Sequence, residues 1–511
     1  MRVTEVAGGA GNAGGVGGGS GLVSSGAAQA RPGAGSQSGS LVLPLALAQF
    51  IASYAATNMN VAISAIAKDL NTTVIGLQTT ITLFTLTMAS LMIPGSKLSD
   101  IWGRKFCFML GLAVYGIGAL LAAFAQSLGL MIFGYSALEG IGSALLIPPV
   151  YILITVAFDD VKSRAKYFGV VSGAGGLGAA AGPLIGGLVT SAISWRASFI
   201  LQVLVVGSIL VMARRIVDPP RRGQRPAFDL EGAVLSAAGL FFVVLGILLS
   251  NTYGWLASRK DFSIAGAVII GTGGVSPIWV FIAIGLIILG WFYLHISARE
   301  RHGKEPLLHR RLFRNHVANL GLGTQLSQWL VMQGSFFVIS VYLQEIWKYN
   351  AIKTGLVLTP TTAGILFTSA IAGRLARKRQ QRTLIIAGFV LTVLGMSLIL
   401  ALVRENSGIV SFLPGLLLMG SGVGVMMTAS VNVVQSSFPD SDQGDISGLS
   451  RSVSNLGSSF GTALVGSVLV AAKLPEGKPF AVALGVLVGF GLAGLGAAIA
   501  IPRHAIPQQR Q

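Results

Sequence analysis

The chain has 511 residues, of which 53% are hydrophobic and only 11% are charged, and its mean hydropathy is +0.74. Soluble domains carry about 25% charged residues, so this composition excludes a soluble protein and indicates a polytopic membrane protein. The net charge of +18 is also typical of nucleic-acid-binding proteins, but basic cytoplasmic loops give the same excess. The single cysteine, Cys107, excludes an internal disulfide and a cysteine-based metal cluster.

The chain begins with a segment rich in Gly, Ala and Ser. Residues 1–40 lack the basic start and apolar core of a signal peptide, so we predict a disordered cytoplasmic tail. Fourteen apolar segments follow, most of them near the roughly 20 residues that a spanning helix needs. Their approximate cores are 42–66, 76–97, 106–125, 129–156, 165–191, 197–213, 229–250, 277–297, 318–345, 352–376, 382–403, 409–437, 446–472 and 478–501. The apolar part of residues 251–277 is too short to span, and we expect an interfacial segment or a small outer hairpin there.

Lys and Arg residues predict the orientation of these helices. With both termini in the cytoplasm, cytoplasmic segments hold 27 of the 36 basic residues, Arg451 among them, and outer segments hold nine. This bias follows the positive-inside rule, so we expect both termini to be cytoplasmic. The bias also accounts for the net charge without nucleic acid as a partner.

Two parts of the chain resemble each other. Shifted by 279 residues, Gly169, Leu177, Gly178, Gly182 and Gly187 fall on Gly448, Leu456, Gly457, Gly461 and Gly466. Shifted by 280, Leu138, Gly140 and Gly142 fall on Leu418, Gly420 and Gly422. We therefore predict two homologous six-helix bundles over 41–216 and 301–502, with two helices and an outer loop inserted over 217–300 and a short cytoplasmic tail over 503–511. Repeated halves around a midplane site are typical of transporters.

The segment 173–187, GAGGLGAAAGPLIGG, allows two interpretations. Its Gly173-x-Gly175-x-x-Gly178 pattern matches the dinucleotide fingerprint, which requires a preceding strand and an acidic residue about 20 residues later. The segment instead lies within an apolar run, and the next acidic residue after Gly178 is Asp218. We therefore interpret it as a membrane helix whose glycines share one face and whose Pro183 can bend it.

Two motifs now resemble a known family. The segment Ser96-Lys-Leu98-Ser-Asp100-Ile-Trp-Gly103-Arg104-Lys105 resembles the G-x-L-x-D-x-x-G-R-K/R loop of the major facilitator superfamily, with Ser96 in place of the first glycine. Gly178-x-x-x-Gly182-Pro183-x-x-Gly186-Gly187 resembles the antiporter motif of that superfamily, and fourteen spanners indicate its drug:proton antiporters. The resemblance implies that Asp100, Gly103, Arg104 and Lys105 form a conformational gate; a solvated loop is the alternative.

Glu139 is the only acidic residue well inside a predicted span. A charged carboxylate is costly in the bilayer, and burial favours its protonated form, which suits a proton carrier or a cation-binding group. The alternative is a structural glutamate that bonds a neighbouring helix. The family's usual charged positions appear here as Ala55 and Ser136, so either the proton site has moved to Glu139 or proton coupling is lost.

Polar residues inside the spans are candidates for lining a substrate cavity, although helix–helix hydrogen bonds are an equal alternative for each one. They are Asn58, Gln78, Gln325, Gln328, Gln333 and Asn432, with Asn455 and the aromatic Trp329 as further candidates. The five histidines show no metal-ligand spacing, and we find no catalytic triad and no Walker motif. We expect no metal, no cofactor, no enzymatic activity and no ATP-driven pumping.

The sequence therefore predicts an all-α, major-facilitator-type membrane protein of two six-helix bundles plus two inserted helices. We expect a monomeric secondary transporter in the inner or plasma membrane that exports amphipathic small molecules, cations among them, in exchange for protons. A uniporter or specific metabolite carrier without proton coupling is the alternative within transport. A non-transporting membrane sensor is the alternative outside it.

Overall fold

The computed structural model describes residues 34–158, 161–216, 228–264, 267–404, 407–439, 442–471 and 478–502. Within them the chain forms fourteen long helical segments, so the predicted all-α polytopic fold is confirmed. Of the tail predicted over 1–40, residues 1–33 lie outside the described residues. Residues 34–40 belong to the first helix, which begins at Ala34. The tail predicted over 503–511 also lies outside them.

The helices follow the predicted apolar segments in order. They are α1 (Ala34–Asp69), α2 (Val74–Trp102), α3 (Arg104–Ala123), α4 (Leu128–Met131), the π-helix η1 (Ile132–Glu139), α5 (Gly140–Ala157), α6 (Val161–Ala192), α7 (Trp195–Ala213), α8 (Leu230–Tyr253), α9 (Pro277–Arg301), the 3-10 helix η2 (Arg310–Arg314), α10 (His316–Glu345), α11 (Ala351–Lys378), α12 (Gln381–Leu402), the 3-10 helix η3 (Ile409–Phe412), α13 (Leu413–Gln435), α14 (Gln443–Ala471) and α15 (Lys478–Ala500). The elements α4, η1 and α5 follow one another directly and together form the fourth span. In the described residues twelve segments are long and apolar enough to cross a bilayer; α11 and α14 are as long but richer in Thr and Ser.

Polar side chains begin several of these helices where the sequence changes from loop to apolar run. Thr73 accepts a hydrogen bond from the Gly76 amide at the start of α2, and Asn315 accepts one from Ala318 at the start of α10. Such caps satisfy amide groups that a helix leaves unpaired at its first turn. These capping residues stand in the polar breaks between the apolar runs, so the helices begin close to where the sequence predicts.

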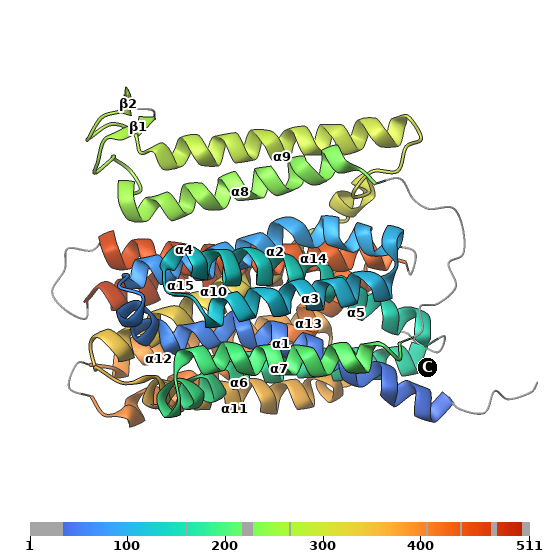
Figure 1. The fold of residues 1–511 in the computed structure, drawn as a ribbon, viewed down its shortest axis with the longest axis horizontal. Helices are drawn as coiled ribbons and strands as arrows, with labels where there is room; N and C mark the ends of the chain where they lie inside the picture. The colour runs from blue at the N-terminus through green and yellow to red at the C-terminus, as the bar shows by residue number, and fades with distance from the viewer. Residues whose placement is uncertain are drawn as a thin grey trace, which may run out of the picture.

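All long helices run roughly parallel or antiparallel to one axis (Figure 1). We call one end of this array, at the right in Figure 1, the basic end: α2 ends and α3 begins there, and those helix ends carry Lys97 and Arg104. The opposite end carries the strands β1 (Phe262–Ile264) and β2 (Ala267–Ile270), and we call it the hairpin end. These two antiparallel strands form the small hairpin that was one of the two expectations for 251–277.

The inserted pair α8 and α9 lies on one side of the remaining helices (Figure 1). Helix α8 packs against α2 and α14, whereas α9 packs mainly on α8. Near the hairpin end, the Trp255 indole donates a hydrogen bond of 2.9 Å to Ser467 Oγ. The insertion therefore covers the line where the first bundle meets the second.

Glycine contacts repeat between the two bundles. A Cβ on Gly142 would lie 2.7 Å from the Gly111 carbonyl oxygen, and a Cβ on Gly388 would lie 2.8 Å from the Gly422 carbonyl oxygen. The first contact joins α5 to α3, and the second joins α13 to α12. Small residues let helix backbones approach closely in a bilayer, where no hydrophobic force holds helices together. These two contacts join helix pairs that correspond in the predicted repeat.

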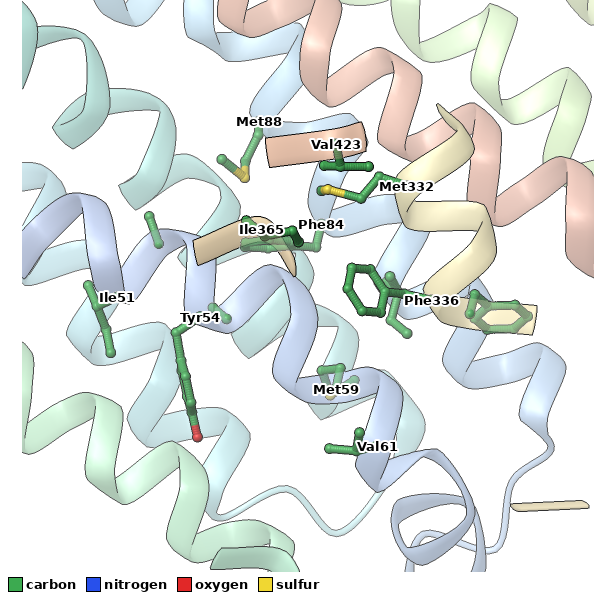
Figure 2. Close-up of a cluster of buried hydrophobic side chains, with 14 of the residues drawn as sticks. Ile51, Tyr54, Met59, Val61, Phe84, Met88, Met332, Phe336, Ile365 and Val423 are labelled. Carbon is green, nitrogen blue, oxygen red and sulfur yellow. The ribbon is translucent and has the colours of Figure 1, made fainter. Parts of the chain in front are cut away.

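The two bundles meet through two related helix pairs, α2 with α14 and α6 with α11. Between them lies a buried apolar cluster that draws on both halves (Figure 2). Phe84 of α2 stacks on Tyr135 of η1 with 4.5 Å between ring centroids, and Met332 and Phe336 of α10 face the same region. The two halves are therefore in direct contact, and the region between them is where a functional site shared by both halves would lie.

Candidate transport site

Three glycines of α6 form the contact with α1. A Cβ on Gly178 would lie 2.1 Å from the Phe50 carbonyl oxygen, and a Cβ on Gly182 would lie 2.0 Å from Thr57 Oγ1. Gly186 faces Asn58 in the same way, at 1.9 Å from Oδ1. Because the segment is continuous helix on both sides, it lacks the strand and turn of a dinucleotide site. The glycine spacing serves helix packing.

The other face of the same motif contacts the second bundle. A Cβ on Gly355 of α11 would lie 2.4 Å from the Pro183 carbonyl oxygen, and a Cβ on Gly187 would lie 2.5 Å from the Ala351 carbonyl oxygen. Helix α6 therefore packs closely on both bundles, and Pro183 removes one internal hydrogen bond from it at the interface. A helix placed in this way can transmit a movement of one bundle to the other.

The two bundles are joined by hydrogen bonds near the hairpin end. The Ser64 amide donates to Gln344 Oε1 at 3.1 Å, and Ser64 Oγ donates to Glu345 Oε1 at 2.9 Å. Gln344 Nε2 in turn donates to the Asn60 carbonyl oxygen at 2.9 Å. Across the α6–α11 pair, the Ile352 amide donates to Ser191 Oγ at 2.8 Å. These contacts close the hairpin end.

A cavity of about 40 Å³ remains between the bundles. Its lining comes from α1, α2, α5, α6, α10 and α14 and consists of Gln49, Ala52, Ser53, Ala56, Thr57, Met88, Ile147, Ala179, Trp329, Arg451, Ser454 and Asn455. Sites that hold drug-sized ligands have roughly 300–1,000 Å³, so the cavity is contracted in this state. A second cavity of about 70 Å³ lies within the C-terminal bundle alone, among apolar side chains of α10, α12 and α15. Because it lies inside one bundle, a movement of the two bundles against each other would not open this cavity to either side of the membrane.

The polar residues predicted to line the cavity mostly bond to neighbouring helices. Gln78 Nε2 donates to the Thr462 carbonyl oxygen at 3.1 Å, and Gln333 Nε2 donates to the Ala56 carbonyl oxygen at 2.9 Å. The side chains of Gln325 and Gln328 accept hydrogen bonds from Ser450 and Ser430, at 2.7 and 2.9 Å. Asn58 is buried against α6, and Asn432 is exposed. Trp329 and Asn455, the further candidates, do line the cavity.

Arg451 is the charged residue of the described lining, whereas the orientation rule predicts it among the cytoplasmic segments. It lies in the third turn of α14, inside the predicted span over 446–472. Its guanidinium donates a hydrogen bond to the Tyr151 hydroxyl and lies over that ring, with 5.1 Å between Cζ and the centroid. The signal that could have identified it is a basic residue within an apolar helix.

Glu139 lies inside the N-terminal bundle and does not line the cavity. Its side chain is fully buried, and neither carboxyl oxygen has a hydrogen-bond partner among the described residues. It ends the π-helix η1, an irregular turn of a kind found often at functional sites. The expected attraction of cations depended on a carboxylate in the cavity, and the described lining contains none.

Two tyrosines connect the neighbourhood of Glu139 to α1. Tyr115 and Tyr135 lie beside the Glu139 carboxyl. The Tyr115 hydroxyl donates to Gln202 Oε1 at 2.6 Å, and the Tyr135 hydroxyl donates to the Ala55 carbonyl oxygen at 3.0 Å. Gln202 Nε2 is also buried without a partner among the described residues. The cluster thus holds an unused donor and two unused acceptors next to a helix that lines the cavity.

At the basic end, a one-residue turn at Gly103 joins α2 to α3. Its φ of +111° lies in a region that disfavours other residues, which explains the glycine of the loop motif. Arg104 pairs with Asp100 at 3.7 Å, and Lys105 Nζ donates to the Arg214 carbonyl oxygen at 2.9 Å. Both contacts stay within the N-terminal bundle.

Lys97 makes a longer-range contact that the sequence analysis missed. Its ammonium group lies 3.7 Å from Glu305, in the segment that leads into the C-terminal bundle. Ser96 also packs against α14, since a Cβ on Gly448 would lie 3.1 Å from the Ser96 Cβ. The motif spacing includes both residues, but nothing in it shows which basic residue faces the other half.

The Major Facilitator Superfamily model matches residues 45–276 and 262–462. The chain is 25% identical over 413 residues to the multidrug resistance protein Stp of Mycobacterium tuberculosis, a match that covers 81% of this chain and 72% of that protein. It is 28% identical over 431 residues to a puromycin resistance protein of Streptomyces alboniger (84% and 81%) and 26% identical over 442 residues to a tetracenomycin C resistance and export protein of Streptomyces glaucescens (86% and 77%).

Among solved structures, the fold is similar to that of a mutant of the peptide transporter POT in complex with alafosfalin. The TM-score is 0.63 at 15% identity, with 91% of this chain and 95% of that chain covered. This likeness concerns the fold alone. Because the family model covers most of the chain, the protein belongs to the Major Facilitator Superfamily and is a membrane transport protein rather than an enzyme.

Proposed function

We propose that the protein exports amphipathic small molecules across the inner or plasma membrane by alternating access, as a monomer. The observation that carries this proposal is the contracted cavity between two repeated bundles, closed at the hairpin end. Relatives named for drug resistance and export support efflux as its direction. The excess of Lys and Arg supports placing the basic end and both termini in the cytoplasm.

The transport cycle follows from the two bundle contacts. Rocking of the bundles would break the bonds of Ser64 and Gln344 near the hairpin end and open the cavity on that side. The tight α1–α6 contact would keep the N-terminal bundle rigid while α6 slides against α11. Gly355 and Pro183 at that interface leave few side-chain obstacles to the movement.

We assign proton coupling to Glu139. An ionised carboxylate in this enclosed site would need a donor, and the Tyr115 hydroxyl is close enough to leave Gln202 for it. Since Tyr115 and Tyr135 both lie against α1, such an exchange would change the support of the helix that lines the cavity. Protonation on one side and release on the other would then bias the two states of the transporter.

The test is flux of a fluorescent amphipathic dye from proteoliposomes under an imposed pH gradient. Glu139→Gln should abolish acceleration by the gradient and leave dye exchange without a gradient in place, because the amide keeps the shape but cannot ionise. Glu231→Gln, at an acid whose side chain is 64% exposed, is the matched control and should behave as wild type. Gradient-driven flux that persists in Glu139→Gln contradicts the assignment.

A uniporter or specific metabolite carrier is the second candidate, favoured by the position of Glu139 away from the cavity. In that case Glu139 is a neutral structural acid. Wild-type flux would then depend on the substrate gradient alone and would not respond to pH. A sensor without transport activity predicts no dye flux, whether or not a pH gradient is imposed.

A further inference from the structure

Arg451 occupies a position where a charged side chain is expensive. It lies on α14 inside the helical array and lines the cavity between the bundles. A guanidinium at membrane depth is usually paired, exposed to water or functional. Within the described part of the chain, no acidic side chain forms an ion pair with it. Among the described residues, no acidic side chain therefore neutralises its positive charge.

The hydrogen bonds of Arg451 leave most of its donors available. A guanidinium has five N–H groups in a fixed fork, and the structure shows one bond, to the neutral Tyr151 hydroxyl. That hydroxyl lies 3.4 Å from Gln49 Oε1, which also lines the cavity. Such a fork matches a carboxylate or a similar planar anion with two parallel hydrogen bonds.

The remaining walls suit an organic ligand. Ala52, Met88, Ile147 and Trp329 form apolar surfaces, and Asn455 supplies an uncharged polar group. Together with Arg451 they combine one cationic anchor with apolar walls. An amphipathic cation would meet the guanidinium without a compensating carboxylate, which is unfavourable in a cavity of low dielectric.

We propose that the transported molecules are amphipathic organic anions and that Arg451 determines this specificity. The proposal rests on the proposed export function and names the substrate class of that same cavity. The Arg451–Tyr151 contact also joins α14 of one bundle to α5 of the other. An anion that takes up the guanidinium competes with this contact, so binding would loosen the bundles near the basic end.

The test compares two xanthene dyes of similar size, anionic carboxyfluorescein and cationic tetramethylrhodamine ethyl ester, by fluorescence anisotropy with the purified full chain. Wild type should bind the anion more tightly. Arg451→Gln should raise the Kd of the anion about tenfold or more and leave that of the cation unchanged or lower. Arg451→Lys should keep part of the affinity, since it retains the charge but not the fork.

Arg404→Gln is the control, because Arg404 is exposed in a loop of the C-terminal bundle and should leave both Kd values unchanged. Tighter binding of the cation by wild type overturns the proposal, and so does an anion Kd that Arg451→Gln leaves unaltered. Thermal melting shows whether each variant is folded. If Arg451→Gln does not fold, the loss of anion affinity is measured in Arg451→Lys instead. Carboxyfluorescein that binds through Arg451 but never crosses proteoliposomes overturns the export function and leaves the binding class standing.

Discussion

Gly178 of α6 faces the backbone of α1 so closely that a methyl group has no room. A Cβ there would lie 2.1 Å from the Phe50 carbonyl oxygen, 1.3 Å short of the 3.4 Å at which ordinary contact begins. Because the obstacle is backbone rather than a flexible side chain, the two helices must separate. Overpacking of this kind costs about 1–3 kcal/mol, and alanine returns roughly 0.5–1 kcal/mol through its better helix propensity.

We therefore expect Gly178→Ala to lower the stability of the protein by about 1 kcal/mol and to reduce dye efflux strongly, since α1 and α6 both line the cavity. Gly176→Ala is the matched control on the same helix, because a Cβ at Gly176 meets nothing within 4 Å. The measurements are thermal melting of the purified variants and flux from proteoliposomes. Equal melting temperature and equal flux for the two variants would refute the close-packing argument.

Two further predictions concern the basic end. Gly103→Ala should lower the melting temperature, because φ of +111° costs an alanine about 1–3 kcal/mol; a melting curve that matches wild type contradicts a required glycine turn. At the start of α8, burial raises the pKa of Asp229, but hydrogen bonds from Gly232, His295 and Leu307 outweigh it and leave the pKa below the usual 3.8. The ionised Asp229 therefore stabilises the folded state above pH 3.8, and this stabilisation is lost as pH falls through the lowered pKa. Asp229→Asn should thus lower the free energy of unfolding by about 1–3 kcal/mol at neutral pH and leave it unchanged in strong acid. Melting of both proteins across pH tests this, and a difference that stays constant down to about pH 3 contradicts it.

The candidate site was only partly predictable from the sequence. Gly178, Gly182 and Gly186 were assigned to one helix face by their spacing alone, and the structure places that face against α1. Gln325, Gln328 and Gln333 of α10 were equally visible, but their partners lie on α14, α13 and α1, far along the chain. Periodicity reports the face of a helix and not the neighbour that the face meets.

The clearest difference concerns the charged residues. Glu139 was identified because an acid inside an apolar run is costly, but its position within one bundle depends on how α1, α3 and α7 close around it. Arg451 was predicted to lie in a cytoplasmic segment, because basic residues near helix ends usually follow the positive-inside rule. Its place on the cavity wall follows from the rotation of α14 toward α5.

The sequence by itself determined the membrane class, the helices in order, the repeat of two bundles and the family motifs. These depend on composition, apolar length and residue spacing, which are local properties of the chain. The tertiary structure decided which polar groups meet across the bundles, that the cavity is contracted, and that its described charge is an arginine instead of a carboxylate. Those features depend on helix rotation and on contacts between residues far apart in the chain, 300 positions for the Arg451–Tyr151 pair and 384 for the Gln78–Thr462 pair.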